Sequence, residues 1–219
     1  MQATSRALAS LFVLPLVLGS ACASRPAADA GSFGPVTEQQ RAPALAAWSE
    51  ALRRAESLPP SRLLYEARFG QRSVRVSGTL AVVATPESLK ATATGPFGSS
   101  LAQYENGALR VKGREPLFLD PDLLRGALAG IWKSGPPTVA GSRGADCLLR
   151  WEAPGVTAQA VFDVAAARVK SLRVENGRAD VSVAFSGSFD PWPQIVELSD
   201  AKSGQRLRLK RVAVEPIRD

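Results

Sequence analysis

The stretch SVRVSGTLAVV, residues 73–83, alternates apolar and polar side chains. Successive side chains of an extended strand point to opposite faces, so this pattern predicts a strand with one apolar and one polar face. The apolar face would carry Val74, Val76, Leu80 and Val82, and the polar face Arg75, Ser77, Thr79 and Ala81. A strand that is buried on one side and solvated on the other is typical of an antiparallel sheet.

The same period of two recurs along most of the chain. It precedes this stretch in RLLYEARFG, residues 62–70, and follows it in SLKATAT, residues 88–94. Asn106-Gly107 and Asn176-Gly177 are dipeptides that favour two-residue hairpin turns. Further alternating or apolar runs lie at residues 99–105, 108–113, 147–153, 157–164, 168–175, 179–189, 193–200 and 206–214. We therefore expect about nine to eleven strands in an antiparallel meander.

Two segments instead have the spacing of amphipathic helices. The first runs from residue 44 to the Pro59-Pro60 pair, which would end it. Its apolar stripe would be formed by Leu45, Trp48, Leu52 and Ala55. The second lies within residues 119–132, after the capping residue Asp120. Its apolar stripe would be formed by Leu124, Leu128 and Ile131.

Together these elements predict one mainly β domain of the α+β type, residues 44–219. So many antiparallel strands curl, which favours a curved antiparallel sheet forming an incomplete β-barrel, covered by two or three short helices. The inward-facing residues would be Val76, Leu80, Leu124, Leu128, Ile131, Val183 and Phe185. These residues would either line an apolar cavity that accepts an acyl chain or form a filled core, and periodicity does not distinguish the two.

The composition argues against an enzyme and against a nucleic-acid-binding protein. The chain of 219 residues has no histidine. It therefore cannot form a catalytic triad that needs an imidazole or a metal site with histidine ligands. No glycine-rich phosphate loop or Cys-x-x-Cys pair occurs, and Asp120 with Asp122 is explained as a helix cap. Lys and Arg outnumber Asp and Glu by 27 to 20 but are spread along the chain. We expect no catalytic residue, cofactor, metal or nucleic-acid partner.

The N-terminus predicts export. Arg6 precedes an apolar run, residues 7–18, with the length of a signal-peptide core, so residues 1–21 would be a signal peptide. The next residues, GSAC, resemble the lipobox of bacterial lipoproteins, in which the cysteine, here Cys22, carries the lipid. Ordinary cleavage after Ala23 is the alternative. Residues 22–43, rich in Ala, Gly and Pro, would form a flexible tether.

The chain has one other cysteine, Cys147. A disulfide between the two would stabilise little, because Cys22 heads the tether. We therefore expect a lipidated Cys22 and a lone buried Cys147. Ala23, where some lipoproteins have Asp, resembles the pattern of lipoproteins that are passed on to the outer membrane, so we expect a lipid anchor there with the domain facing the periplasm.

Three short motifs resemble one family. Residues 95–99, GPFGS, are similar to a Pro-Leu-Gly turn with Phe97 in place of Leu, and residues 193–200 and 204–210 resemble the family's last two strands. With Trp48 in the first helix, these motifs resemble the LolB-like outer-membrane lipoproteins of the LolA/LolB fold. The resemblance implies a monomeric lipoprotein that accepts lipoprotein acyl chains from a LolA-like periplasmic carrier and helps insert them into the membrane.

The resemblance also implies a role for the turn of Pro96, Phe97 and Gly98. In the family this turn protrudes, and its apolar side chain pushes cargo into the membrane. The alternative is that Phe97 folds back as an ordinary core residue. Two other functions stay open for the chain as a whole: a periplasmic protein that binds lipids or other hydrophobic ligands, and a structural envelope lipoprotein.

A basic row is predicted near the C-terminus. In QRLRLKR, the side chains of Arg206, Arg208 and Lys210 share one face of a strand. Such a row is either a solvated edge or a docking face for anionic lipid headgroups or an acidic carrier.

The lipid anchor can be tested directly. The mature protein should partition into detergent and incorporate a radioactive fatty acid, and Cys22→Ser should abolish both properties because it removes the acceptor thiol. Labelling that survives the substitution would contradict the assignment of Cys22.

Overall fold

The structure is a computed structural model that describes residues 33–71, 74–85, 88–95, 98–105, 108–111, 121–132 and 135–217. Cys22, Pro96, Phe97 and Asp120 lie outside the described residues. All the described helices and strands fall between residues 38 and 216, so a chain that starts at Ala23 contains every described element of the fold.

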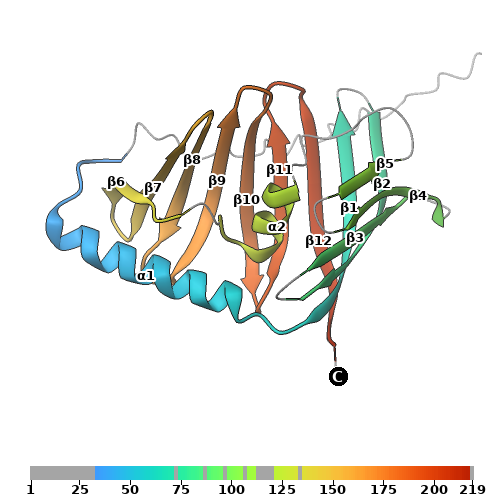
Figure 1. The fold of residues 1–219 in the computed structure, drawn as a ribbon, viewed down its shortest axis with the longest axis horizontal. Helices are drawn as coiled ribbons and strands as arrows, with labels where there is room; N and C mark the ends of the chain where they lie inside the picture. Colours follow the sequence, from blue (N-terminus) through green and yellow to red (C-terminus); the bar gives the residue numbers. More distant parts are fainter. Residues whose placement is uncertain are drawn as a thin grey trace, which may run out of the picture.

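Twelve strands form a single antiparallel sheet that wraps around two helices (Figure 1). The helices are α1 (Glu38–Glu56) and α2 (Pro121–Ala129). The strands are β1 (Ser61–Gln71), β2 (Val74–Ala84), β3 (Leu89–Thr94), β4 (Ser100–Glu105), β5 (Ala108–Val111), β6 (Thr138–Arg143), β7 (Asp146–Ala153), β8 (Val156–Asp163), β9 (Arg168–Asn176), β10 (Asp180–Phe189), β11 (Pro193–Asp200) and β12 (Gln205–Pro216). The expected curved antiparallel sheet is confirmed.

The strand order is β5-β4-β3-β2-β1-β12-β11-β10-β9-β8-β7-β6. Strands that are consecutive in the chain are neighbours in each half, and the first and last strands pair to join the halves. The described strands number twelve, more than the nine to eleven expected. The additional strand is β6, whose segment looked like a loop because its sequence, TVAGSR, contains only one large apolar side chain, Val139.

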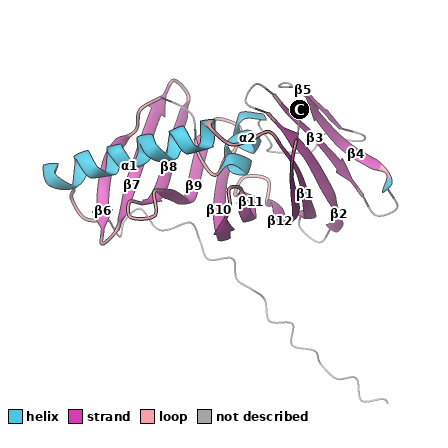
Figure 2. Ribbon diagram, turned by 90° about the horizontal axis from the view of Figure 1, so that it is seen from below, coloured by secondary structure: helices cyan, strands magenta, loops and turns pink. Residues whose placement is uncertain are grey.

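Helix α1 lies across strands β6 to β9, on the concave side of the sheet (Figure 2). Its central side chain, Trp48, is only 3% exposed. The Trp48 ring meets Trp151 edge-on with 5.0 Å between ring centroids, and it meets Phe162 at 5.7 Å. Edge-to-face aromatic pairs of this kind each contribute about 0.5–1.5 kcal/mol beyond their buried area. Trp48 therefore fixes where the helix sits on the sheet.

Helix α1 begins at Glu38, six residues before the expected start, so the expected boundary between tether and domain at residue 44 is wrong. The side-chain oxygen of Gln40 accepts a hydrogen bond from the backbone N–H of Thr37 at 3.0 Å, as in a capping box. Pro43, a residue type that is unfavourable in a helix interior, lies inside α1. Ahead of the helix, Gly34 forms an isolated antiparallel bridge with Ser142 at the edge of β6.

Helix α2 enters the concavity near β10 and β11 (Figure 1). Its apolar side is buried: Leu123, Leu124, Ala127 and Leu128 are at most 4% exposed. The helix ends because Gly130 adopts a left-handed conformation, with φ of 69°. One helical turn before Gly130, only glycine fits at position 126, because a Cβ there would lie 2.6 Å from the carbonyl oxygen of Ile131.

The base of the turn that carries Phe97 packs against strand β2. Gly95 is buried, and its N–H donates to the carbonyl oxygen of Ser99 at 2.9 Å. A Cβ on Gly78 would overlap the carbonyl oxygen of Thr94 and lie 3.2 Å from the Cα of Gly95. The absence of a side chain at Gly78 thus lets β3 cross closely over β2.

Gly78→Ala should therefore lower the free energy of unfolding by about 1–3 kcal/mol, the typical cost of overpacking. Urea unfolding followed by circular dichroism measures this change. Gly177→Ala is the matched control, because a Cβ at Gly177 meets no atom within 4 Å. Equal stability of the two variants would show that the close approach at Gly78 is not a constraint.

Candidate functional site

A cavity of about 720 Å³ lies between helix α2, the end of α1 and the concave face of the sheet. This volume is within the range of about 300–1,000 Å³ that is usual for small-molecule sites. The apolar lining residues are Ala55, Leu58, Pro59, Ala84, Leu89, Leu123, Ala129, Ile131, Trp132, Ala153, Val156, Val174, Ala179, Val181 and Trp192. The remaining lining residues are Glu56, Thr85, Arg125, Gly126 and Asn176.

The polarity of the lining suits a molecule with a long apolar part and a small polar part. Among the lining residues, only Glu56 and Arg125 carry a charge. Glu56 is exposed at the end of α1, and Arg125 is partly exposed on α2, so both charges belong to the solvent-accessible part of the site. Apolar side chains therefore predominate among the described lining residues, while polar atoms contribute much of the lining surface.

Of the seven residues predicted to line a cavity, only Ile131 is among those that line this one. Leu80, Leu124, Leu128 and Val183 are at most 7% exposed and belong to the packed core. Val76 and Phe185 are half-buried, and the Phe185 ring contacts Phe189 with 5.8 Å between centroids. The structure thus contains both a filled core and a cavity, at different places along the concave face.

Two tryptophans of the cavity wall were not predicted. Trp192 lies between β10 and β11 in the sequence DPWP, which resembles a turn, yet its side chain is only 5% exposed. Arg211 holds this segment by donating from its guanidinium to the carbonyl oxygens of Asp190 and Trp192, the first at 2.9 Å. Trp132 lies three residues after the end of α2. The indole nitrogens of both tryptophans are buried and have no hydrogen-bond partner within the described part of the chain.

Arg211 points to the same side as Tyr65, its partner across the β1–β12 pair. Burial raises the pKa of the Tyr65 hydroxyl, and the positive charge of Arg211 opposes this rise only in part. Tyr65 is fully buried and therefore stays a neutral phenol. It is a core residue beside the segment that carries Trp192.

The turn that was predicted to insert into the membrane is described only at its base. Gly98 is exposed and has a φ of 73°, a conformation that favours glycine. Its N–H donates to the carbonyl oxygen of Gly95 at 3.2 Å. Together with the bond from Gly95 to Ser99, this bond joins the end of β3 to the start of β4.

The basic row lies on the opposite face from the cavity. Arg206, Arg208 and Lys210 are exposed, and Leu207 and Leu209 between them are buried. The Arg208 guanidinium pairs with Glu197 of the neighbouring strand at 3.0 Å. The row and the cavity are thus two separate features of the fold.

Cys147 is the only cysteine among the described residues, and it is 3% exposed. Burial, together with the neighbouring Asp146, raises the pKa of its thiol to about 11. The thiol therefore stays protonated near neutral pH and is a poor nucleophile.

The part of the chain that the structure describes contains no cluster of His, Cys, Asp and Glu that could hold a metal ion. Its helices are also too short or too polar to cross a bilayer.

The curved sheet with helices on its concave side also occurs in solved structures. A putative outer membrane lipoprotein-sorting protein domain from Vibrio parahaemolyticus superposes with a TM-score of 0.53, over 79% of this chain and 92% of that domain. The chain has the fold of a lipoprotein-sorting domain. The two sequences are 12% identical, so the likeness concerns the fold alone.

A DUF1329 family protein from Desulfovibrio piger is also similar, with a TM-score of 0.49 and 9% identity over 80% of this chain and 93% of that one. No protein-family model matches the sequence, and no curated protein matches it.

Proposed function

We propose that this protein is an envelope lipoprotein that holds acyl chains of lipids or lipoproteins in the cavity beside α2 and hands them to a membrane. The observation that carries the proposal is the cavity itself, which is wide, lined mostly by apolar residues and bordered, among the described residues, by two charged side chains, Glu56 and Arg125. We also propose that the protein binds and transfers without catalysing a reaction.

The energetics of an acyl chain suit such a cavity. Each methylene group that leaves water contributes about 0.8 kcal/mol, so a chain with about ten buried methylenes gains on the order of 8 kcal/mol before the entropic costs of binding. Hydrocarbon contacts are non-directional, so the apolar lining residues accept acyl chains of different lengths. The lining therefore favours a carrier that recognises hydrocarbon over one that recognises a particular headgroup.

The finer parts of the proposal come from the sequence. A lipid on Cys22 would anchor the protein, Ala23 favours the outer membrane, and Phe97 would act as a LolB-like tip that delivers cargo received from a LolA-like carrier. The fold shared with a putative lipoprotein-sorting domain supports a role in binding lipids or lipoproteins. The competing function is a protein that binds acyl chains but does not deliver them. Substitutions of Phe97 distinguish the two functions, because only delivery would need this side chain.

Leu58→Glu should weaken binding of an environment-sensitive fluorescent fatty acid by tenfold or more, because it places a charge in the cavity wall. Leu58 is half-buried and follows α1 directly, so the domain should still fold. The control is Leu64→Glu, the same chemical change at a side chain that is 38% exposed on the other face of the sheet. If the unaltered protein binds no such probe, or if both variants bind equally well, the cavity is not the acyl site.

Phe97→Glu should block the transfer of bound acyl cargo to vesicles and leave cargo on the protein, while Phe97→Leu should be tolerated. A substitution on an exposed turn typically changes the free energy of unfolding by at most about 0.5 kcal/mol. Thermal unfolding and vesicle transfer are measured on the same variants. A Phe97→Glu protein that unfolds, or that is stable and transfers normally, would contradict a delivery role for the turn.

A further inference from the structure

The face of the sheet that points away from α1 and α2, here called the outer face, is strongly basic over three neighbouring strands. Side chains alternate along β1, β2 and β12, and the residues opposite each other in register share a face. The exposed cations on the outer face of these strands are Arg62 and Arg68 of β1, Arg75 of β2, and Arg206, Arg208 and Lys210 of β12. In the sequence, only the row of cations on β12 is evident. The cations of β1 and β2 join it because these strands lie beside β12 in the sheet.

Little on the same strands neutralises this charge. The six cations face two carboxylates, Glu66 opposite Lys210 and Glu215 opposite Arg62. Arg208 pairs with Glu197 of β11. Within the described part of the chain, Arg68, Arg75 and Arg206 form no ion pair with a carboxylate. Their guanidinium groups are therefore available to an external anion.

The arrangement is unfavourable for the fold alone. Arg68 lies directly opposite Arg208 in the β1–β12 register. Like charges opposite each other destabilise a strand pair. Arg206 and Arg75 both lie opposite Gly70, one on each side of it, so no side chain of β1 separates them. A binding partner of opposite charge would relieve this repulsion.

Exposed aliphatic side chains continue the same surface. Leu64 is 38% exposed, Val83 36% and Val212 59%. Leu64 and Val83 are diagonal neighbours across the β1–β2 pair, and the bulge that carries Val212 lies beside Leu64 in the β1–β12 pair. A surface with arginines at one end and exposed aliphatic groups at the other suits lipid headgroups with the acyl boundary beneath them.

The N-terminal segment reaches the sheet on this same face. Phe33 stacks under the Arg143 guanidinium at 4.6 Å, and a Cβ on Gly141 would lie 2.8 Å from the Cβ of Phe33. Gly141 is paired with Leu148, whose neighbours Cys147 and Leu149 point into the core, so Phe33 lies on the outer face. The chain therefore joins the domain from the outer side.

The length of the preceding chain is sufficient for this face to meet the membrane. Phe33 lies eleven residues after Cys22, a span of up to about 36 Å at about 3.3 Å per residue. Six strand spacings of about 4.8 Å, about 29 Å in total, separate β6 from β12. A lipid on Cys22 can thus lie in the same bilayer surface that β12 contacts.

We propose that the outer face of β2, β1 and β12 docks on the surface of an anionic bilayer, with Arg68, Arg75, Arg206 and Arg208 on the phosphates and Leu64, Val83 and Val212 at the interface. The proposal goes beyond acyl binding in the cavity and relies on the lipid anchor only for the argument from chain length. It orients the cavity and α2 away from the contacted bilayer surface, open to a carrier that arrives from the aqueous side.

The test uses the chain from Ala23 onward, without lipid, and vesicles of phosphatidylcholine with or without phosphatidylglycerol. Sedimentation should show binding to the anionic vesicles that is lost at 0.5 M salt. Arg68→Gln with Arg206→Gln should lower the partition coefficient by about tenfold or more, because each cation near an anionic surface contributes several-fold. Val212→Ser should lower it further without changing its salt dependence.

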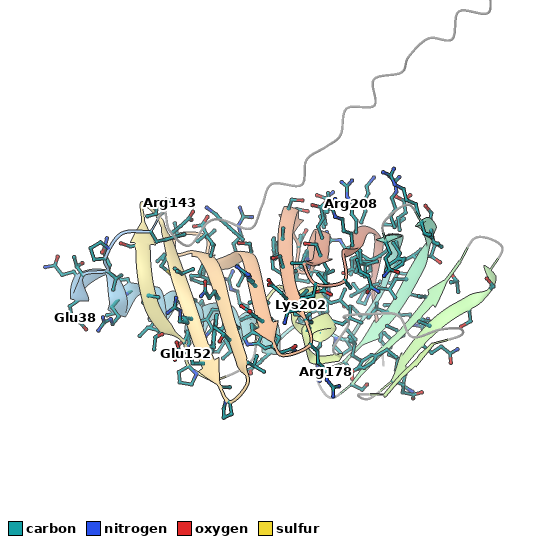
Figure 3. The ribbon with its side chains drawn as sticks, turned by 90° about the horizontal axis from the view of Figure 1, so that it is seen from above. Glu38, Arg143, Glu152, Arg178, Lys202 and Arg208 are labelled. Carbon is teal, nitrogen blue, oxygen red and sulfur yellow. The ribbon has the colours of Figure 1, made fainter. Side chains whose placement is uncertain are left out.

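The matched control neutralises Arg53 of α1 and Arg178 of the β9–β10 turn. Arg178 and Arg208 lie well apart in Figure 3. This control should bind like the unaltered chain.

Equal binding to neutral and anionic vesicles, an equal loss in the control, or no vesicle binding at all would overturn the proposal. If the chain binds no vesicles but binds an acidic protein in a salt-sensitive way, the outer face is assigned to a protein partner instead. Binding of the fatty-acid probe is measured separately, so either proposal can fail alone.

Discussion

The pairing of the first strand with the last is the interaction on which the rest of the structure depends. β1 and β12 pair in antiparallel register from Ser61 opposite Pro216 to Gln71 opposite Gln205. Without this pair the chain would be two separate meanders, β1–β5 and β6–β12, each with an exposed edge at β1 or β12. Closing a loop of this length is entropically costly, so formation of the pair is the non-local step of folding.

The same pairing creates both functional surfaces. On the concave side it brings the β2–β3 junction and the end of α1 toward the β7–β8 and β9–β10 turns, and α2 occupies only part of the space between them. The remainder is the cavity. On the outer side it places Arg68 of one half beside Arg208 of the other, so the basic face exists only in the joined sheet.

The two surfaces divide the proposed tasks between the faces of one sheet. The concave face is packed around Trp48, Phe162 and Leu128 where α1 and α2 cover it, and it leaves an apolar space where they do not. No described helix lies against the outer face, which carries charge. A sheet that is apolar inside and basic outside can rest on a bilayer while its cavity stays accessible from water.

The sequence by itself determined the class of fold. Alternation in residues 62–70 and 73–83 and the stripe around Trp48 are local patterns, and each reports which side of an element is buried whatever its partner. Strand β6 was not predicted because an edge strand with Gly141 and Ser142 buries few side chains. The start of α1 was missed because residues 22–43 are rich in Ala, Gly and Pro, a composition typical of a tether.

Only the tertiary structure decided where the cavity lies and which cations gather. Leu80, Leu124, Leu128 and Val183 have the same inward pattern as Ile131, yet they fill the core while Ile131 borders the void, because a void depends on the summed volumes of side chains from distant segments. The basic face likewise depends on register, since a shift of one residue between β1 and β12 would turn Arg68 and Arg208 to opposite faces.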